Sequence, residues 1–361
     1  MTIEERIKQK AVELGFELAG IAPAGENRHA DAFRNWLAAG RHADMDWLAR
    51  KPERRVDPRI VVPGARSLIM VGVSYFIQNP PPEKWNDPSR GRIARYAWGQ
   101  DYHDVITPLL KSLVEFIKQE TSEETRCRYY IDTGPVLERS WSAEAGLGFI
   151  GKNTLLINPG LGSYVFLGGI LTDLELDPDE PAQDDGATYP AKPEQDIRRA
   201  GTCGSCRRCL DICPTHAFPA PYILDSNRCI SYLTIELRGS IPEPLRVKMS
   251  NWIFGCDECQ SICPWVRRYS RALEDNFLTY DHEISAPRLL DLIELDEDGF
   301  RKRFRKTPVI RAKRRGLLRN VAVALGNWGD PSAKPALERA VADSEPLIRE
   351  HAKWALERIS G

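Results

Sequence analysis

Cysteines supply the clearest chemistry in this chain. Eight of its nine cysteines lie between positions 203 and 263, in a Cys-x2-Cys-x2-Cys-x3-Cys-Pro run, a Cys-x2-Cys-x3-Cys-Pro run and Cys229 between them. Four thiolates hold a four-iron four-sulfur cluster, and in chains with two such runs the last cysteine of each run binds the other cluster. The spacing therefore predicts two clusters and single-electron transfer. One set is Cys203, Cys206, Cys209 and Cys263, and the other is Cys213, Cys229, Cys256 and Cys259.

Zinc sites and disulfides fit the same cysteines less well. Zinc ribbons pair Cys-x2-Cys without a third cysteine two residues on, and they lack the Cys-Pro ending. Disulfides need an oxidising compartment, whereas we expect no export leader ahead of the helix predicted at 3–14, and hence a cytoplasmic protein. Cys229 departs from the ferredoxin spacing because a long loop separates it from Cys256. Cys127 belongs to neither run and is predicted to be a buried thiol.

The overall charge hides a local basic stretch. The net charge is −1 at pH 7, yet positions 301–319 hold ten Lys or Arg and no Asp or Glu, while 174–180 and 291–298 are acidic. Such a stretch favours a polyanionic partner, although it is also compatible with a solvated helix face. No apolar run approaches the roughly 18 residues of a membrane helix. With 361 residues, of which 42% are hydrophobic, the chain can build two or three domains.

The apolar pattern divides the chain into four parts. Helical and strand patterns mix through 1–175 and predict an α/β or α+β first domain. A Pro- and Asp-rich insertion at 176–199 precedes a ferredoxin-like two-cluster domain at 200–270, and a basic helical tail fills 271–361. In this tail the segment 319–325 is echoed at 349–356. The echo predicts short HEAT-like helical repeats that lean on the preceding domain.

Several elements are expected in the first domain. The apolar run Ser67–Tyr75 predicts a buried strand, and a second strand is expected at Arg126–Asp132. Apolar spacing predicts an amphipathic helix at His103–Gln119, and Glu138–Gly146 is a shorter helix. The segments 153–157 and 163–172 are predicted to form a hairpin around an Asn-Pro-Gly turn at 158–160.

Together these motifs resemble one known family. A strand that ends in Asp-Thr-Gly-Pro at 132–135 is followed by Gly-Phe-Ile-Gly-Lys-Asn-Thr at 148–154, then by the cysteine runs and the helical tail. The combination is similar to the epoxyqueuosine reductases, cobalamin-dependent iron–sulfur enzymes of tRNA queuosine biosynthesis, over nearly the whole chain. The cofactor modules resemble corrinoid reductive dehalogenases more distantly. The resemblance implies that the epoxide of epoxyqueuosine, at the wobble position of a tRNA anticodon, is reduced to the cyclopentene of queuosine.

Asp132 is the expected proton donor for this chemistry. Expelling an epoxide oxygen as water needs a proton, and low-potential clusters suit an acceptor such as a corrinoid cobalt, which takes electrons singly. Asp132 follows an apolar strand, where loops commonly carry reactive side chains. Partial burial near a cofactor would favour its protonated form at neutral pH. The alternative is an aspartate that only caps the turn at 133–135.

The resemblance also implies a cobalamin site. The sequence has no Asp-x-His-x-x-Gly segment to supply a lower axial histidine, and the resemblance implies a corrin bound base-off. Corrin amides need hydrogen-bonding partners, and the phosphate tail needs positive charge. The cofactor-binding residues implied in this way are Arg55, Arg95, Asp132, Lys152, Asn153, Ser163, Ser231, Cys256 and Asp257. For Arg55 and Arg95, a solvated surface position is an open alternative.

The predicted RNA partner rests on positive charge and on one loop. Basic side chains in the stretch that ends at Arg319 are expected to neutralise phosphates, which makes affinity salt-dependent. The loop after Cys229 is expected near the anticodon, with Tyr232 and Trp252 as stacking platforms. The residues chosen as tRNA contacts are Arg238, Gly239, Arg311, Lys313, Arg314 and Arg315. A small redox protein is the expected electron donor, and the chain is expected to be a monomer without a membrane partner.

Two other functions are compatible with parts of the sequence. A corrinoid reductive dehalogenase of a small organohalide predicts an export leader and no basic helical tail. An electron-transfer subunit needs clusters but no substrate cavity, and the segment 132–154 argues against it. A corrinoid absorption spectrum of the purified protein separates these functions.

Overall fold

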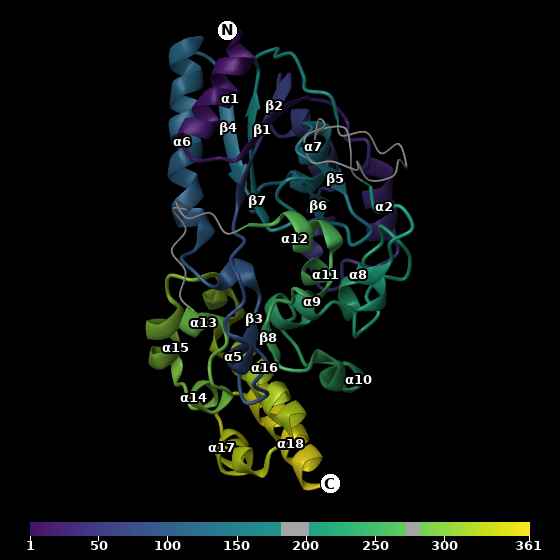
Figure 1. Ribbon diagram of the computed structural model, residues 1–361, viewed down its shortest axis with the longest axis vertical. Helices are drawn as coiled ribbons and strands as arrows, with labels where there is room; N and C mark the ends of the chain where they lie inside the picture. Colours follow the sequence, from purple (N-terminus) through teal and green to yellow (C-terminus); the bar gives the residue numbers. More distant parts are fainter. Residues whose placement is uncertain (182–201, 272–281) are drawn as a thin grey trace.

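The first part of the chain folds around a four-stranded sheet that is antiparallel throughout, with the order β1-β2-β7-β4. The computed structural model describes residues 1–181, 202–271 and 282–361 (Figure 1). The strands of this sheet are β1 (Leu18–Pro23), β2 (Ser67–Ser74), β4 (Cys127–Ile131) and β7 (Val165–Thr172). The predicted strands at 67–75 and 126–132 are therefore confirmed. Every residue of β2 is buried, because the strand lies inside the sheet and helices cover both faces.

Helices cover the two faces of this sheet (Figure 1). On one face, α1 (Ile3–Glu13) and the long α6 (Tyr102–Glu120) bury Ile7 and Ile106 in a shared core. On the other face, α7 (Glu138–Glu144) buries Trp141. Asp101 caps α6 by accepting a hydrogen bond from the backbone N–H of His103, which stabilises the start of the helix at Tyr102. Shorter helices in the connections are α2 (Ala30–Ala38), α3 (Asp46–Ala49), α4 (Glu53–Val56) and α5 (Pro82–Trp85).

One predicted strand pairing is wrong. The segments 153–157 and 163–172 do not form a hairpin, because β6 (Leu156–Ile157) pairs with β5 (Phe149–Ile150), whereas β7 pairs with β2 and β4. The turn itself is present, since Asn158 and Gly162 exchange two backbone hydrogen bonds of 2.8 Å. Between two long strands, β7 satisfies more of its backbone groups than it would beside the two-residue β6.

The cysteine segment consists of short helices and loops. Its helices are α8 (Arg208–Asp211), α9 (Ile230–Ile235), α10 (Glu243–Arg246), α11 (Glu258–Ser261) and α12 (Pro264–Tyr269). Its one named strand within the described residues, β8 (Trp252–Phe254), pairs in parallel with β3 (Arg92–Ile93) from the first part of the chain. Backbone pairing therefore joins the cysteine segment to the N-terminal part.

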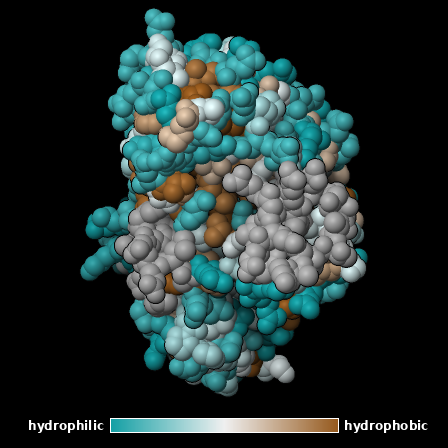
Figure 2. Space-filling view, turned by 45° about the horizontal axis from the view of Figure 1, so that its top comes forward, coloured by the Kyte–Doolittle hydropathy of each residue, from teal (hydrophilic) through white to brown (hydrophobic). Residues whose placement is uncertain are grey.

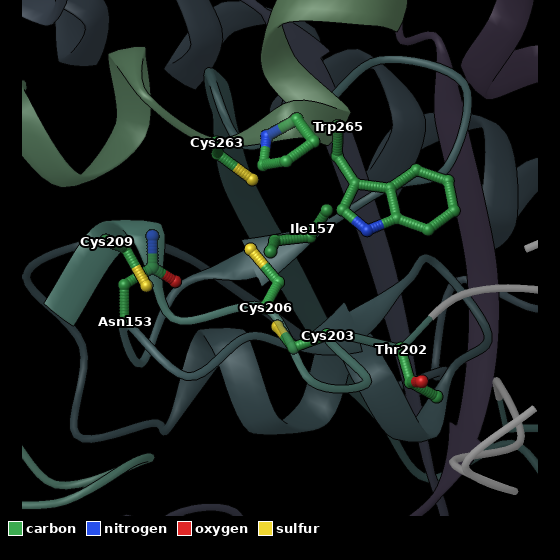
Figure 3. A pocket seen from close by; sticks show the side chains of 9 residues that line it. Asn153, Ile157, Thr202, Cys203, Cys206, Cys209, Cys263 and Trp265 are labelled. Carbon is green, nitrogen blue, oxygen red and sulfur yellow. The ribbon is translucent and has the colours of Figure 1, made fainter. Parts of the chain in front are cut away.

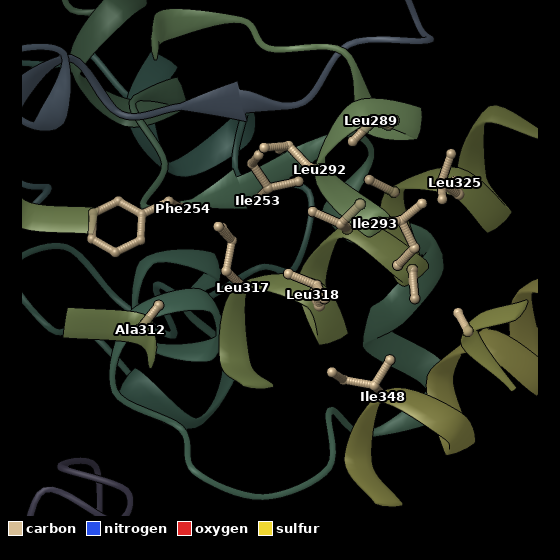
Figure 4. Packing of buried hydrophobic residues seen from close by; sticks show 14 of the residues in the cluster. Ile253, Phe254, Leu289, Leu292, Ile293, Ala312, Leu317, Leu318, Leu325 and Ile348 are labelled. Atoms are coloured by element: carbon tan, nitrogen blue, oxygen red, sulfur yellow. The ribbon is translucent and has the colours of Figure 1, made fainter. Parts of the chain in front are cut away.

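The C-terminal part is helical and packs around α16. Its helices are α13 (His282–Ser285), α14 (Leu289–Ile293), α15 (Glu297–Phe304), α16 (Lys313–Trp328), α17 (Lys334–Ala340) and α18 (Pro346–Ser360). In Figure 4, Leu317, Leu318 and Leu325 of α16 share a core with Ile348 of α18 and with Phe254 of the cysteine segment. The echoed segments 319–325 and 349–356 thus lie on helices that pack together, and a HEAT-like repeat stays a prediction.

Two segments of the predicted division cannot be compared with the structure. Most of the predicted insertion at 176–199, and residues 272–281 of the tail, lie outside the described residues. Within the described ranges, no helix has both the length and the apolar character needed to cross a bilayer. On the face shown in Figure 2, hydrophobic residues gather near the centre, whereas hydrophilic residues cover most of its periphery.

Gly20→Ala is expected to destabilise the protein by about 1–3 kcal/mol or more. A Cβ at Gly20 in β1 would lie 2.1 Å from the backbone oxygen of Ala145, just after α7, so strand and helix end would have to move apart. Gly25→Ala is the matched control, because a Cβ there meets nothing within 4 Å. Urea unfolding of both variants checks this expectation, and equal stabilities would contradict the close approach.

Candidate active site and cysteine sets

The thiols of the first predicted set face one common space. Cys203, Cys206, Cys209 and Cys263 line a single pocket, together with Asn153, Ile157, Thr202, Pro264 and Trp265 (Figure 3). Cys263 reaches this pocket because it stands at the start of α12, whereas the other three come from the loop before α8 and from α8 itself. The structure therefore brings together the four thiols that the crossed pattern assigns to one cluster.

The second set is more deeply enclosed. Burial raises the pKa values of the Cys256 and Cys259 thiols, and the neighbouring Cys229 adds to both shifts. Burial also raises the pKa of Cys229, with a smaller contribution from Cys213. In the described part of the chain, no three His, Cys, Asp or Glu side chains are arranged to hold a single metal ion. Cys127, outside both sets, lies in β4 with its Sγ 3.6 Å from Thr172 Oγ1.

Asp132 lies at the end of β4 in a left-handed backbone conformation, with φ of 54°. Its Oδ2 accepts a hydrogen bond of 2.8 Å from the Tyr102 hydroxyl, and Arg311 Nη1 lies 3.8 Å from the same oxygen. Burial and the Asp132 charge raise the pKa of Tyr102, so that its hydroxyl remains a donor. The Asp132 side chain is 53% exposed, so the protein alone buries it only in part.

His103 follows Tyr102 at the start of α6 and stacks on its ring, with centroids 4.3 Å apart. A hydrogen bond of 2.8 Å joins its Nδ1 to Asp101 and raises the pKa of His103. Its Nε2 is buried and has no hydrogen-bond partner among the described residues. The start of α6 therefore presents a phenol and an imidazole to the Asp132 loop.

Helix α7 adds two further polar side chains. The Glu138 Oε1 is buried without a partner among the described residues, and burial raises the pKa of this carboxyl to about 8. Arg139 Nη1 donates to the Thr154 carbonyl over 2.7 Å, and burial lowers the pKa of Arg139. Arg139 also interacts electrostatically with Asp132 and with Cys259, so it lies between the aspartate and the second cysteine set. Arg55 Nε is unpaired as well, while its Nη1 donates to the Gly134 carbonyl over 3.3 Å.

Arg95 and Asp257, two predicted cofactor residues, contact each other inside the protein. The Arg95 N–H donates to Asp257 Oδ2 over 2.7 Å, and the Arg95 guanidinium lies 4.3 Å from the Tyr164 ring centroid. Its Nε donates to the Ile77 carbonyl, and the residue is only 4% exposed. The solvated alternative for Arg95 is therefore wrong, because this arginine joins the first part of the chain to the second cysteine loop.

Four other predicted cofactor residues also contact the cysteine loops. The Lys152 N–H donates to Cys203 Sγ over 3.4 Å, and its Nζ donates to the Cys206 carbonyl over 3.0 Å. Asn153 Nδ2 donates to the Cys259 carbonyl over 3.4 Å, and Ser163 donates to Gln260. Ser231 lies in α9, where its backbone N–H interacts with the Cys229 thiol. In this structure these four residues therefore hydrogen-bond to the cysteine loops. Of the predicted cofactor residues, Arg55 and Asp132 lie instead beside α7, whose Glu138 Oε1 is unpaired among the described residues.

The predicted RNA contacts fall into separate places. Arg311 reaches Asp132 and also places its Nη2 2.9 Å from Glu236 Oε1, while Arg238 Nη1 donates to the Arg311 carbonyl over 3.1 Å. Gly239 is exposed beside Arg238. Tyr232 and Trp252 are 7% and 3% exposed, so the prediction that they offer stacking surfaces is wrong.

The rest of the basic stretch lies away from this cluster or inside the protein. Lys313, Arg314 and Arg315 line a groove of about 800 Å³ that also contains Asp296, Glu297 and Glu345. Arg314 donates to the Leu295 carbonyl and forms a two-armed ion pair with Asp343. Arg319 is 0% exposed, so the expectation that it neutralises a phosphate is wrong. Acidic partners and burial reduce the free positive charge that the sequence suggests.

Sequence reasoning missed five side chains that meet near Asp132. These are Tyr102, His103, Glu138, Arg139 and Glu236. The one local signal was the Asp-Tyr-His start of α6, a capping aspartate followed by two groups that can donate hydrogen bonds. No spacing rule connects that helix start to a strand end farther along the chain.

Comparison with known proteins gives two family matches. Residues 55–133 match the family model described as "Epoxyqueuosine reductase QueG, DUF1730", and residues 202–266 match "4Fe-4S double cluster binding domain". An epoxyqueuosine reductase from Xanthomonas campestris is 40% identical over 355 residues, which cover 97% of this chain and 94% of that protein. Proteins of the same name from Pseudomonas aeruginosa and Escherichia coli are 39% and 38% identical over 99% and 98% of this chain, and over 94% and 89% of their own lengths.

Solved structures give the same result. An epoxyqueuosine reductase crystallised with an epoxyqueuosine-modified tRNA-Tyr stem loop matches with a TM-score of 0.86 and 30% identity, over 99% of this chain and 90% of that one. The Bacillus subtilis epoxyqueuosine reductase, with its catalytic loop swung out of the active site, matches with a TM-score of 0.85 and 29% identity, over the same shares. A reductive dehalogenase matches with a TM-score of 0.41 and 16% identity, over 74% of this chain and 32% of that one, which is too distant to support an argument.

Glu138→Gln is expected to flatten the pH dependence of stability. Since folding raises the pKa of this carboxyl from 4.5 to about 8, the wild type loses stability as the pH rises through that range, whereas the glutamine variant does not. At about pH 9 the variant should be more stable by roughly 2 kcal/mol or more, and near pH 4 the two should agree. Urea unfolding of the cofactor-free proteins checks this. Glu357→Gln, an exposed change on α18, is the control, and equal slopes for Glu138→Gln and wild type would contradict the expectation.

Proposed function

The chain belongs to the epoxyqueuosine reductase family and is an oxidoreductase; from that premise we propose that it reduces epoxyqueuosine to queuosine at the wobble position of tRNA anticodons, with Asp132 as the proton donor. The observation that carries this proposal is the hydrogen bond from Tyr102 to Asp132, in a site where unpaired polar groups adjoin two cysteine sets. The chain acts in the cytoplasm as a monomer, and a small redox protein supplies its electrons.

Asp132 supplies a proton where the epoxide oxygen leaves. Reduction of the epoxide to an alkene takes up two electrons and two protons and releases water. The Tyr102 hydroxyl donates to Oδ2 of Asp132, so that Oδ1 is the atom that carries the transferable proton. Tyr102 is itself held by rings on both faces, because it stacks on His103 and on Phe166 at centroid distances of 4.3 and 4.5 Å. Because Tyr102 is held in place by this packing, its hydrogen bond fixes the orientation of the Asp132 carboxyl group.

The residues around Asp132 suit a corrin. Among the described residues, Arg55 Nε, His103 Nε2 and Glu138 Oε1 are buried polar atoms without partners, and a ligand bound beside Asp132 would supply those partners. Amide side chains of cobalamin offer both donors and acceptors for them. When bound there, cobalamin supplies a cobalt centre that takes up single electrons and reduces the epoxide. Arg55 and Arg139 add the positive charge that favours its phosphate.

The two cysteine sets would hold two four-iron four-sulfur clusters, which would supply single electrons. The Cys203 set and the Cys256 set each offer four thiolates to a cubane cluster. Arg139 interacts electrostatically with both Asp132 and Cys259, which supports the second set as the one nearer the substrate. On this proposal the second set would hold the cluster that supplies electrons near the substrate, and the first set would hold the cluster that receives them from the donor. Lys152, hydrogen-bonded to the Cys203 thiol and to the Cys206 carbonyl, stabilises the loop of the first cluster.

The RNA lies over the mouth formed by Asp132, Arg311 and Arg238. Arg238 and Gly239 contact the anticodon loop, and Arg311 contributes charge within reach of Asp132. Lys313 and Arg315, which line the groove of the tail, contact phosphates farther along the stem. Arg314 contributes less, since Asp343 already pairs with it.

Asp132→Asn should lower turnover by roughly 10² or more while cobalamin and RNA still bind. Asparagine keeps the shape and accepts the Tyr102 hydrogen bond, but it has no proton to transfer. Single-turnover conversion of an epoxyqueuosine stem loop, with cobalamin binding measured by absorption, checks the expectation. Loss of cobalamin in proportion to activity would support the turn-capping role of Asp132 instead.

Cys263→Ser should remove the cluster of Cys203, Cys206 and Cys209. Reconstituted wild type should contain about eight irons per chain, and this variant about half of them. Adding Cys206→Ser to Cys263→Ser should cost no further iron, whereas adding Cys256→Ser should remove the remainder. Cys127→Ser is the control. If the Cys206 change removed further iron and the Cys256 change did not, the crossed assignment is wrong.

A further inference from the structure

Arg311 pairs with two carboxylates, at different distances and with different exposure to water. Its Nη2 lies 2.9 Å from Glu236 Oε1, and its Nη1 lies 3.8 Å from Asp132 Oδ2. Glu236 is 18% exposed, whereas Asp132 is 53% exposed, so the contact with Glu236 is both shorter and better shielded from water. Arg311 is thus anchored on Glu236 and pairs with Asp132 through a weaker, more exposed contact.

The main chain that carries Arg311 is fixed on both sides. Val309 and Ala312 are buried in the core of the tail, in the 3-10 helix η6 (Pro308–Ala312). The Arg311 carbonyl accepts from Arg238, and the Lys306 carbonyl accepts a hydrogen bond of 2.9 Å from the N–H of Asp101. A change of partner is therefore confined to the Arg311 side chain, which is 42% exposed.

The contact with Arg311 conflicts with the role of Asp132. A guanidinium beside a carboxylate stabilises the charged form, whereas a proton donor must be a neutral acid. The titratable or charged groups that face Asp132 are Tyr96, Tyr102, His103, Glu138, Arg139 and Arg311. Of the two arginines, Arg139 is held by the Thr154 carbonyl, so Arg311 is the one that can leave.

We propose that Arg311 couples RNA binding to protonation of Asp132. Without RNA, its guanidinium pairs with Asp132; in the complex, Nη1 turns to an RNA phosphate while Nη2 keeps Glu236, and Asp132 takes up a proton from solvent. A phosphate competes well for Nη1, because it accepts charge-assisted hydrogen bonds, whereas Nη1 lies 3.8 Å from the half-exposed Asp132 carboxylate. The inference rests on the proposed function, since it takes the ligand of this mouth to be RNA.

The test compares Arg311→Gln and Arg311→Lys with Arg339→Gln in the holoenzyme. Arg339 is an exposed arginine of the same tail, paired with Glu294, so it controls for the loss of one charge. Binding of an unmodified anticodon stem loop is measured at several salt concentrations, and an epoxyqueuosine stem loop is used for single turnovers at saturating RNA. Thermal melts confirm that each variant is folded.

Arg311→Gln should weaken stem-loop affinity by roughly tenfold and lower the slope of log affinity against log salt by about one. Arg311→Lys should keep most of both, and Arg339→Gln should match the wild type. At saturating RNA the single-turnover rate of Arg311→Gln should fall by a smaller factor than its affinity does, because Arg311 has already left Asp132 in the complex. A tenfold fall in that rate with unchanged affinity would overturn the proposal, as would a variant that matches Arg339→Gln throughout.

Proton uptake tests the coupling itself. Calorimetry in buffers of different ionisation enthalpy should show that stem-loop binding takes up as much as about one proton per complex in the wild type, and clearly less in both Asp132→Asn and Arg311→Gln. Equal uptake in all three proteins would overturn the coupling. A wild type that binds RNA but never converts the modified stem loop would contradict the proposed function, while the salt slopes would still decide whether Arg311 meets a phosphate.

Discussion

The interlocking of the two cysteine sets is the constraint on which the other features of the site depend. All four members of the second set lie between Cys209 and Cys263 in the sequence, yet Cys263 faces the same pocket as Cys209. The intervening chain must therefore leave the first set and return to it. Its long segment after Cys229 carries Glu236 and Arg238 into contact with Arg311, beside Asp132. One loop system thus carries members of the second cysteine set and the partners of Arg311 beside Asp132.

A buried arginine of the helical tail stabilises the segment after Cys229 through hydrogen bonds. Arg319 donates to the carbonyls of Leu233, Leu237 and Gly239, and Asn320 donates to those of Thr234 and Ile253. Because the carbonyls of Leu233, Thr234 and Ile253 would otherwise be buried without partners, these bonds from the helical tail stabilise the loop. The tail therefore contributes to the active site mainly through packing and buried hydrogen bonds, and through Arg311 at its near end.

The sequence was most informative where chemistry depends on local spacing. The cysteine runs and the Asp132 strand end could be read directly, because a cluster loop and a strand end are local features. The prediction of a hairpin at 153–172 was wrong because β7 pairs with β2 and β4, which are distant in the sequence. The basic stretch was misjudged at Arg319 because charge is visible in a sequence but burial is not. The meeting of Tyr102, Arg311 and Asp132 depends on packing between three distant segments, for which no periodic pattern exists.

We infer that this loop system couples both clusters to cobalamin at Asp132. The most direct measurement is anaerobic turnover of an epoxyqueuosine-containing stem loop by reconstituted protein and a chemical reductant, with nucleosides analysed by mass spectrometry. Queuosine is expected only when both clusters and cobalamin are present, and none is expected when either is left out. Formation of queuosine by the cluster-loaded protein without cobalamin would contradict it.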